Sequence, residues 1–133
     1  MLFRSMAVFK PITSEERVAI AEKTLRRIKM VCPRFSLPKD EADRAELTQI
    51  WAEALFSRNV YPRTTYNRAL ALYAASASRD DNPPMPGDIL RYCERAIEDM
   101  ESDPAEREKL YAWRKERRLA RIEQMTGESQ GLD

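Results

Sequence analysis

Apolar residues recur every three or four positions along five segments of this chain, and a proline-containing break separates each segment from the next. This period matches the 3.6 residues per turn of an α-helix, and no run alternates as a convincing strand would. The chain has 133 residues, which predicts a single domain. With only three glycines it also has few points of free backbone rotation. The pattern therefore predicts an all-α protein.

Local signals predict where the first two helices begin and end. Thr13 and Glu16 have the spacing of a capping box, so the first helix is expected to begin there. Pro33 cannot continue a helix and ends it. The second helix is expected near Asp40, since acidic residues in its first turn suit the positive end of the helix dipole. Its Trp51 is the expected centre of the core.

The remaining three helices follow from the same kinds of signal. The third is expected over residues 64–78, and the fourth begins with Pro86 in its first turn. Asp103 and Glu106 repeat the spacing of a capping box, so the fifth helix is expected to run from there to about Met125. The apolar stripes expected to form the core in the first four helices are Val18, Ala21, Leu25, Ile28 and Cys32; Leu47, Ile50, Trp51, Ala54 and Leu55; Tyr66, Ala69, Leu70, Tyr73 and Ala77; and Ile89, Leu90, Cys93, Ala96, Ile97 and Met100.

These helices predict a small four-helix bundle with a fifth, long and protruding C-terminal helix. At about 1.5 Å per residue the fifth helix would reach about 35 Å. The expected organisation is an N-terminal extension (1–12), a helical bundle domain (13–101), a C-terminal helix that serves as a partner-binding arm (102–126), and a disordered tail (127–133).

The composition leaves little equipment for catalysis. The chain has no histidine, which excludes Ser-His-Asp and Cys-His pairs and imidazole metal ligands. The glycines at 87, 127 and 131 stand alone, so neither a Walker A loop nor a GxGxxG fingerprint is present. Cys32 and Cys93 fall on apolar helix faces and are expected to be buried, reduced thiols. We expect no catalytic residues, no bound cofactor and no metal site.

No run of 18 apolar residues occurs, so no membrane span is expected. The first ten residues, MLFRSMAVFK, lack the apolar stretch and the small-residue cleavage site of a secretory signal. Two cysteines do not make a disulfide framework. These features predict a cytoplasmic protein.

The net charge of +1 averages blocks of opposite sign. Residues 1–36 carry eight basic and three acidic side chains, whereas residues 80–100 carry two basic and six acidic ones. The segment 114–121 adds five basic residues and one acidic residue beside Trp113. This basic run could follow a nucleic-acid backbone, dock on an acidic protein, or form the solvated side of a long helix. Charge counting leaves all three interpretations open.

The most distinctive string is the proline-rich turn into the fourth helix, and its position relative to three other motifs resembles a known family. The motifs are Pro33-Arg34-Phe35, Trp51 with Leu55, Ala69-Leu70 with Tyr73, and Asn82-Pro83-Pro84-Met85-Pro86-Gly87-Asp88-Ile89. In this order they are similar to those of the phage replicative helicase loader and inhibitor family. The resemblance covers about residues 14–100.

The resemblance implies a non-enzymatic adaptor that binds a hexameric replicative DNA helicase and loads or inhibits it during phage or prophage replication. It also implies an origin-binding initiator protein as a second partner. The family grips the helicase with its C-terminal region, which is poorly ordered in its members but has strong helical signals here. The partner-binding residues expected on this basis are Leu110, Trp113, Arg114, Arg117, Arg118 and Arg121.

The alternative is a small helical DNA-binding accessory or regulatory protein. It would use the basic first helix and the run Arg114–Arg121 on phosphates. For the adaptor, direct binding to nucleic acid would be secondary. A steep loss of DNA affinity with rising salt would distinguish the phosphate binder from the helicase adaptor.

Overall fold

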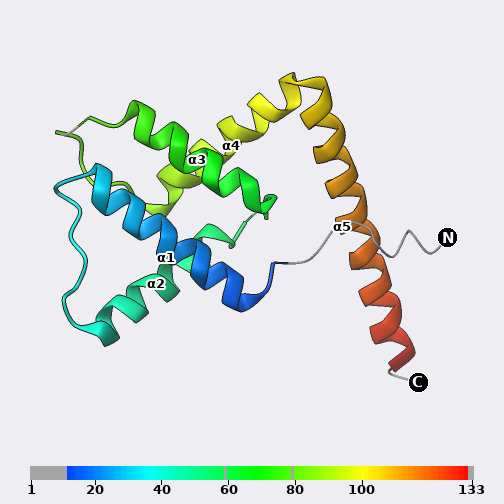
Figure 1. The fold of residues 1–133 in the computed structure, drawn as a ribbon. Helices are drawn as coiled ribbons and strands as arrows, with labels where there is room; N and C mark the ends of the chain where they lie inside the picture. The colour runs from blue at the N-terminus through cyan, green and yellow to red at the C-terminus, as the bar shows by residue number, and fades with distance from the viewer. Residues whose placement is uncertain (1–11, 59, 79, 132–133) are drawn as a thin grey trace. The chain divides into compact units, whose positions relative to one another are not determined.

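A computed structural model describes residues 12–58, 60–78 and 80–131, with side chains described up to residue 126. Every regular element in these ranges is a helix, which confirms the all-α prediction. The described helices are α1 (Ser14–Val31), α2 (Glu41–Leu55), α3 (Arg63–Ser76), α4 (Pro86–Ser102) and α5 (Pro104–Gly131), shown in Figure 1. The expected N-terminal extension (1–12) lies outside the described residues except for Ile12.

The chain divides into two compact units, and the division falls near the end of α4. The first unit, Ile12–Asp99, holds α1, α2, α3 and most of α4 and is called the bundle below. The second unit contains the last turn of α4 and all of α5. The predicted boundary between residues 101 and 102 lies close to this division.

The helix starts form as the sequence predicts. The Thr13 hydroxyl accepts a hydrogen bond from the Glu16 N–H at 3.1 Å, and the Glu16 carboxylate accepts one from the Thr13 N–H at 2.9 Å. Both halves of the capping box are therefore present. Pro86 is the first residue of α4, where its missing N–H costs nothing. The Asp88 carboxylate accepts from the Met85 N–H at 2.8 Å, which stabilises this start from the inside of the first turn.

The core of the bundle forms where α1 packs against both α2 and α3 (Figure 1). Trp51 of α2 is 5% exposed, and the ring of Phe35 meets it edge-on with centroids 6.3 Å apart. The connector between α1 and α2 is thus anchored through Phe35, as expected. On the other side of the core, the Tyr66 ring lies 5.0 Å from Phe56 and 5.9 Å from Tyr61. Aromatic packing therefore fixes both connections that flank α2.

Side chains of α4 contact side chains of α3 within the bundle. The rings of Tyr73 and Tyr92 meet at 5.9 Å in an edge-on contact. The hydroxyls of Ser76 and Tyr92 are hydrogen bonded at 2.6 Å. Behind them, the expected stripe of α4 is buried except for half-buried Leu90. The two tyrosine rings thus pack against each other while the Tyr92 hydroxyl keeps a hydrogen-bond partner.

One expected core residue lies on the surface. Ile50 is 52% exposed, whereas Thr48 is buried. The buried face of α2 runs through Thr48, Trp51, Ala52 and Leu55, and Ile50 lies about 160° around the helix from its centre. The Thr48 hydroxyl donates to the Arg44 carbonyl at 2.9 Å, so its burial leaves no unsatisfied polar group. Packing of Trp51 and Leu55, not the total hydrophobicity of the stripe, sets the rotation of α2.

Two helix ends differ from prediction. Helix α3 ends at Ser76 because Ala77 is extended and the Ser78 N–H bonds the Asp81 carboxylate at 2.7 Å, so the chain turns two residues early. Helix α5 continues to Gly131, so residues 127–131, expected in a disordered tail, are helical. The good helix formers of 114–125 carry the helix past a single glycine at 127. Residues 132–133 lie outside the described part.

Candidate partner-binding surface on helix α5

The six residues predicted to bind a partner all lie on α5, but they do not form one surface. Leu110 is only 1% exposed, so its side chain is enclosed and offers no contact in this conformation. It is therefore removed from the candidate surface. Trp113 is half-buried, and the Arg117 guanidinium lies 5.5 Å from the centre of its ring. This cation–π contact orients both side chains along the helix.

Three predicted arginines stand on the solvent side of α5. Arg114 lies 3.6 Å from the Glu101 carboxylate, and both side chains are about half exposed. An exposed pair of this kind contributes between about 0 and 1 kcal/mol, so Arg114 can exchange this partner for another at little cost. Arg118 and Arg121 are exposed, and no residue in the described ranges forms an ion pair with either. The basic run is therefore presented largely to solvent.

The surface that sequence reasoning missed is apolar. Seven large hydrophobic side chains are exposed among the described residues, and four of them lie on α5. These four, called the α5 apolar face below, are Tyr111 (64% exposed), Leu119 (52%), Ile122 (53%) and Met125 (61%). The other three, Met30, Ile50 and Met85, lie on the bundle.

Helical geometry brings most of this face together. Tyr111, Ile122 and Met125 are spaced by 11 and 3 residues, which places them within about 60° of one another around the helix. Leu119 borders them on one side, and Lys115 and Arg118 lie between them along the axis. The result is an apolar strip in which cations alternate with the apolar side chains. The spacing shows that these residues share one side of α5, but the sequence does not say which side of the helix faces solvent.

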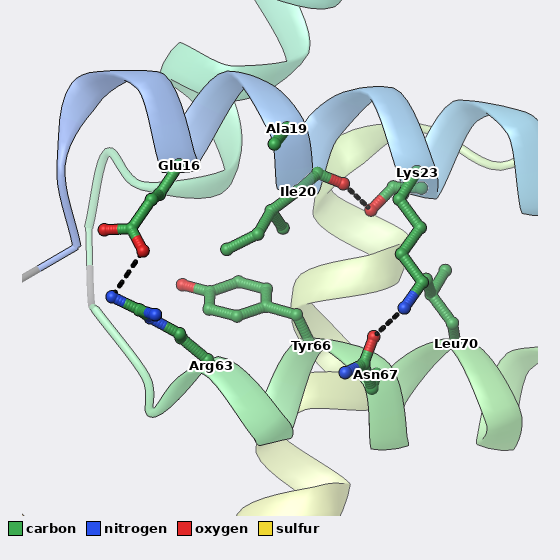
Figure 2. A pocket seen from close by; sticks show the side chains of 9 residues that line it. Glu16, Ala19, Ile20, Lys23, Arg63, Tyr66, Asn67 and Leu70 are labelled. Carbon is green, nitrogen blue, oxygen red and sulfur yellow. Dashed lines mark hydrogen bonds and ion pairs between the residues drawn. The ribbon is translucent and has the colours of Figure 1, made fainter.

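A second feature is a hollow of about 270 Å³ between α1 and α3, shown in Figure 2. Glu16 and Arg63 form an ion pair at 2.5 Å at one end of it. The Lys23 ammonium donates to the Asn67 side-chain oxygen at 2.9 Å at the other end. Tyr66 lies between them, and burial raises the pKa of its hydroxyl well above its ordinary value of 10. The charged side chains at the two ends of the hollow are thus paired with polar partners, and these contacts join α1 to α3.

A third feature is a groove of about 500 Å³ where the proline-rich loop meets α3 and α4. Its rim carries the ion pair of Asp88 with Arg91, and the Arg95 guanidinium lies 5.7 Å from the centre of the Tyr92 ring. Burial raises the pKa of Tyr73, which lines the same groove. Acidic and basic side chains alternate around this groove, so it presents no single charge to a ligand.

Neither cysteine is placed as a nucleophile. Burial raises the pKa of the Cys93 thiol to about 12, and the nearby Glu94 carboxylate adds to this shift. Such a thiol is protonated at neutral pH, whereas the reactive form of cysteine is the thiolate. Cys32 is 1% exposed and contacts the Asp81 carbonyl oxygen at 4.0 Å. Both side chains act as small core residues.

Two further findings concern sites of other kinds. Among the described residues, no group of three or more cysteine, aspartate or glutamate side chains is placed to hold a metal ion. No described helix is both long enough and apolar enough to cross a bilayer.

No protein-family model, curated protein or solved structure matches this chain. The resemblance to helicase loaders thus rests on the four sequence motifs. In the structure Phe35 and Trp51 of two of these motifs pack against each other. The proline-rich motif caps α4 through Met85 and Asp88. These residues have structural roles, and none of them belongs to the α5 apolar face.

Proposed function

We propose that this chain is a non-enzymatic adaptor that binds a hexameric replicative helicase and loads or inhibits it during phage or prophage DNA replication. The observation that carries the proposal is the α5 apolar face, with four large side chains between 52% and 64% exposed on one helix. Exposing such a strip to water is unfavourable, and large exposed apolar patches mark surfaces that a partner covers. The sequence resemblance supplies the identity of that partner.

The physics of the α5 apolar face fits a helix that lies in a groove. Burying a side chain such as Ile122 or Met125 contributes about 1.5–3 kcal/mol each. Anchors spaced along one helical face are the usual way in which an amphipathic helix binds a hydrophobic groove. Lys115 and Arg118 lie among the anchors and would pair with acidic residues at the rim of the groove. A partner groove with an apolar floor and acidic edges is therefore expected on the helicase.

Only Asp103 separates α5 from α4 along the chain. The peptide turns between Ser102 and Pro104, and the Arg107 N–H bonds the Asp103 carbonyl at 2.8 Å, so α5 begins immediately after α4 ends. The chain carries no phosphate-binding loop, so any nucleotide dependence of the complex would come from the helicase. An origin-binding initiator, the second partner that the resemblance implies, would use the surfaces of the bundle.

The proposal is tested by mixing the full chain with the purified hexameric helicase of the bacterial host, with and without ATP. Size-exclusion chromatography with light scattering then gives the mass of each species. We expect a peak heavier than the hexamer that contains both proteins in at least one nucleotide state. Elution of the two proteins as separate species in both states would contradict the proposal.

A further inference from the structure

Four arginines of α5 form a straight basic ridge, and three of them have no role in the helicase contact proposed above. They are Arg107, Arg114, Arg118 and Arg121, and all four are exposed. Three of them are spaced by seven residues, so they lie on one side of the helix, and Arg118 lies beside them. At about 1.5 Å per residue the ridge is about 21 Å long. We call these four residues the α5 arginine ridge.

Two acidic residues of α5 lie on the side of the helix away from the ridge. Glu116 and Glu123 lie roughly opposite the ridge, about 160–200° around the helix from Arg114 and Arg121. In the described part of the chain, no carboxylate lies within ion-pair distance of Arg107, Arg118 or Arg121. Arg114 has only the exposed pair with Glu101 at 3.6 Å. The ridge therefore holds several cations without internal neutralisation, which costs free energy unless an anion binds.

Aromatic residues flank the ridge on both sides. Tyr111 is 64% exposed on one edge, and half-buried Trp113 lies on the other edge under the Arg117 guanidinium. Cations in a row beside aromatic rings are the combination that binds single-stranded nucleic acid, because phosphates meet the cations and bases stack on the rings. The carboxylates on a folded acidic protein are scattered over its surface. A nucleic-acid strand carries one phosphate at every nucleotide, which suits a linear row of cations.

From this geometry we propose that the α5 arginine ridge binds the phosphate backbone of single-stranded DNA. Tyr111 and Trp113 provide stacking surfaces for its bases. A second copy of the chain is a poor occupant, because two ridges brought face to face would repel each other. Tyr111 and Arg118 belong to both proposed contacts, whereas Arg107, Arg114 and Arg121 belong to the DNA contact alone. Substituting these three arginines therefore tests DNA binding separately from helicase binding.

The test is fluorescence anisotropy of a labelled 20-nucleotide oligothymidine titrated with the full chain at several salt concentrations. The ridge variant is R107Q/R114Q/R121Q. The matched control is R26Q/R27Q/R34Q, which removes the same charge from exposed positions of the bundle. A single strand releases about 0.7 counterions per neutralised phosphate, so the ridge variant is expected to flatten the slope of log K against log salt by about 2. The control is expected to keep most of the slope.

Several results would overturn the proposal. They are no binding by the unaltered chain, an equal loss in the two triple variants, or tighter binding to a duplex of the same length. A final experiment measures how well polyglutamate displaces the labelled oligonucleotide from the chain. If it displaces the oligonucleotide at the same concentration of charge as unlabelled oligothymidine does, the ridge is a docking site for acidic protein. Weak displacement by polyglutamate and loss of binding in the ridge variant alone would support the DNA assignment.

Discussion

Replacing Trp51 with alanine is expected to lower the free energy of unfolding by about 3–5 kcal/mol, the usual cost of truncating a large aromatic residue in a core. Trp51 is 5% exposed and holds Phe35 of the α1–α2 connector edge-on at 6.3 Å. Removing the indole leaves a cavity at the α1–α2 contact and releases the anchor of the connector. Small helical domains have a total stability of about 5–15 kcal/mol, so the loss is a large share of it.

The neighbouring position provides a matched control. Ile50 also lies on α2 but is 52% exposed, so Ile50→Ala is expected to change the unfolding free energy by about 0.5 kcal/mol or less. Chemical denaturation followed by circular dichroism measures both variants. A similar loss for the two substitutions would show that α2 is rotated differently from the structure described here.

The variant Y111S/I122S/M125S is expected to weaken binding to the helicase by about three orders of magnitude. Each of these side chains would contribute about 1.5–3 kcal/mol when buried in a partner groove. Together they exceed about 4 kcal/mol, and each 1.4 kcal/mol corresponds to a tenfold change in affinity. All three are more than half exposed in the chain itself, so the substitutions should leave its folding intact. Calorimetric titration measures the affinity, and circular dichroism checks the helix content.

The bundle offers a control of the same chemistry. The variant M30S/I50S/M85S also replaces three exposed apolar side chains, but none of them lies on α5. It is expected to bind the helicase with the affinity of the unaltered chain. If this variant loses affinity while the α5 variant keeps it, the partner binds the bundle and the α5 apolar face is not the docking surface.

Much of the fold could be predicted because its signals are local. The capping box of Thr13 and Glu16 depends on residues three positions apart, and both bonds form. Pro86 marks the first turn of α4 because its ring fixes φ near the helical value and removes an N–H that would have no partner in the helix. Burial of Trp51 followed from the stripe around it. Such signals need no knowledge of how the helices meet.

Features that depend on helix rotation could not be predicted in the same way. Ile50 and Trp51 are neighbours in the sequence, yet one is exposed and the other is buried. Leu110 and Tyr111 show the same contrast on α5, with 1% and 64% of their surfaces exposed. Each pair lies about 100° apart around its helix, and only the tertiary contacts decide which member faces inward. The candidate surface therefore moved from Leu110 and Trp113 to Tyr111, Ile122 and Met125.

The most direct test of α5 as the helicase-binding helix is amide hydrogen exchange of the full chain, alone and in the helicase complex, followed by mass spectrometry. We predict that exchange slows about tenfold or more for amides between residues 111 and 125, because docking would suppress local opening of this helix. Peptides from α1 and α2 should exchange at unchanged rates. Slower exchange in the bundle with no change between residues 111 and 125 would contradict the proposal that α5 holds the helicase.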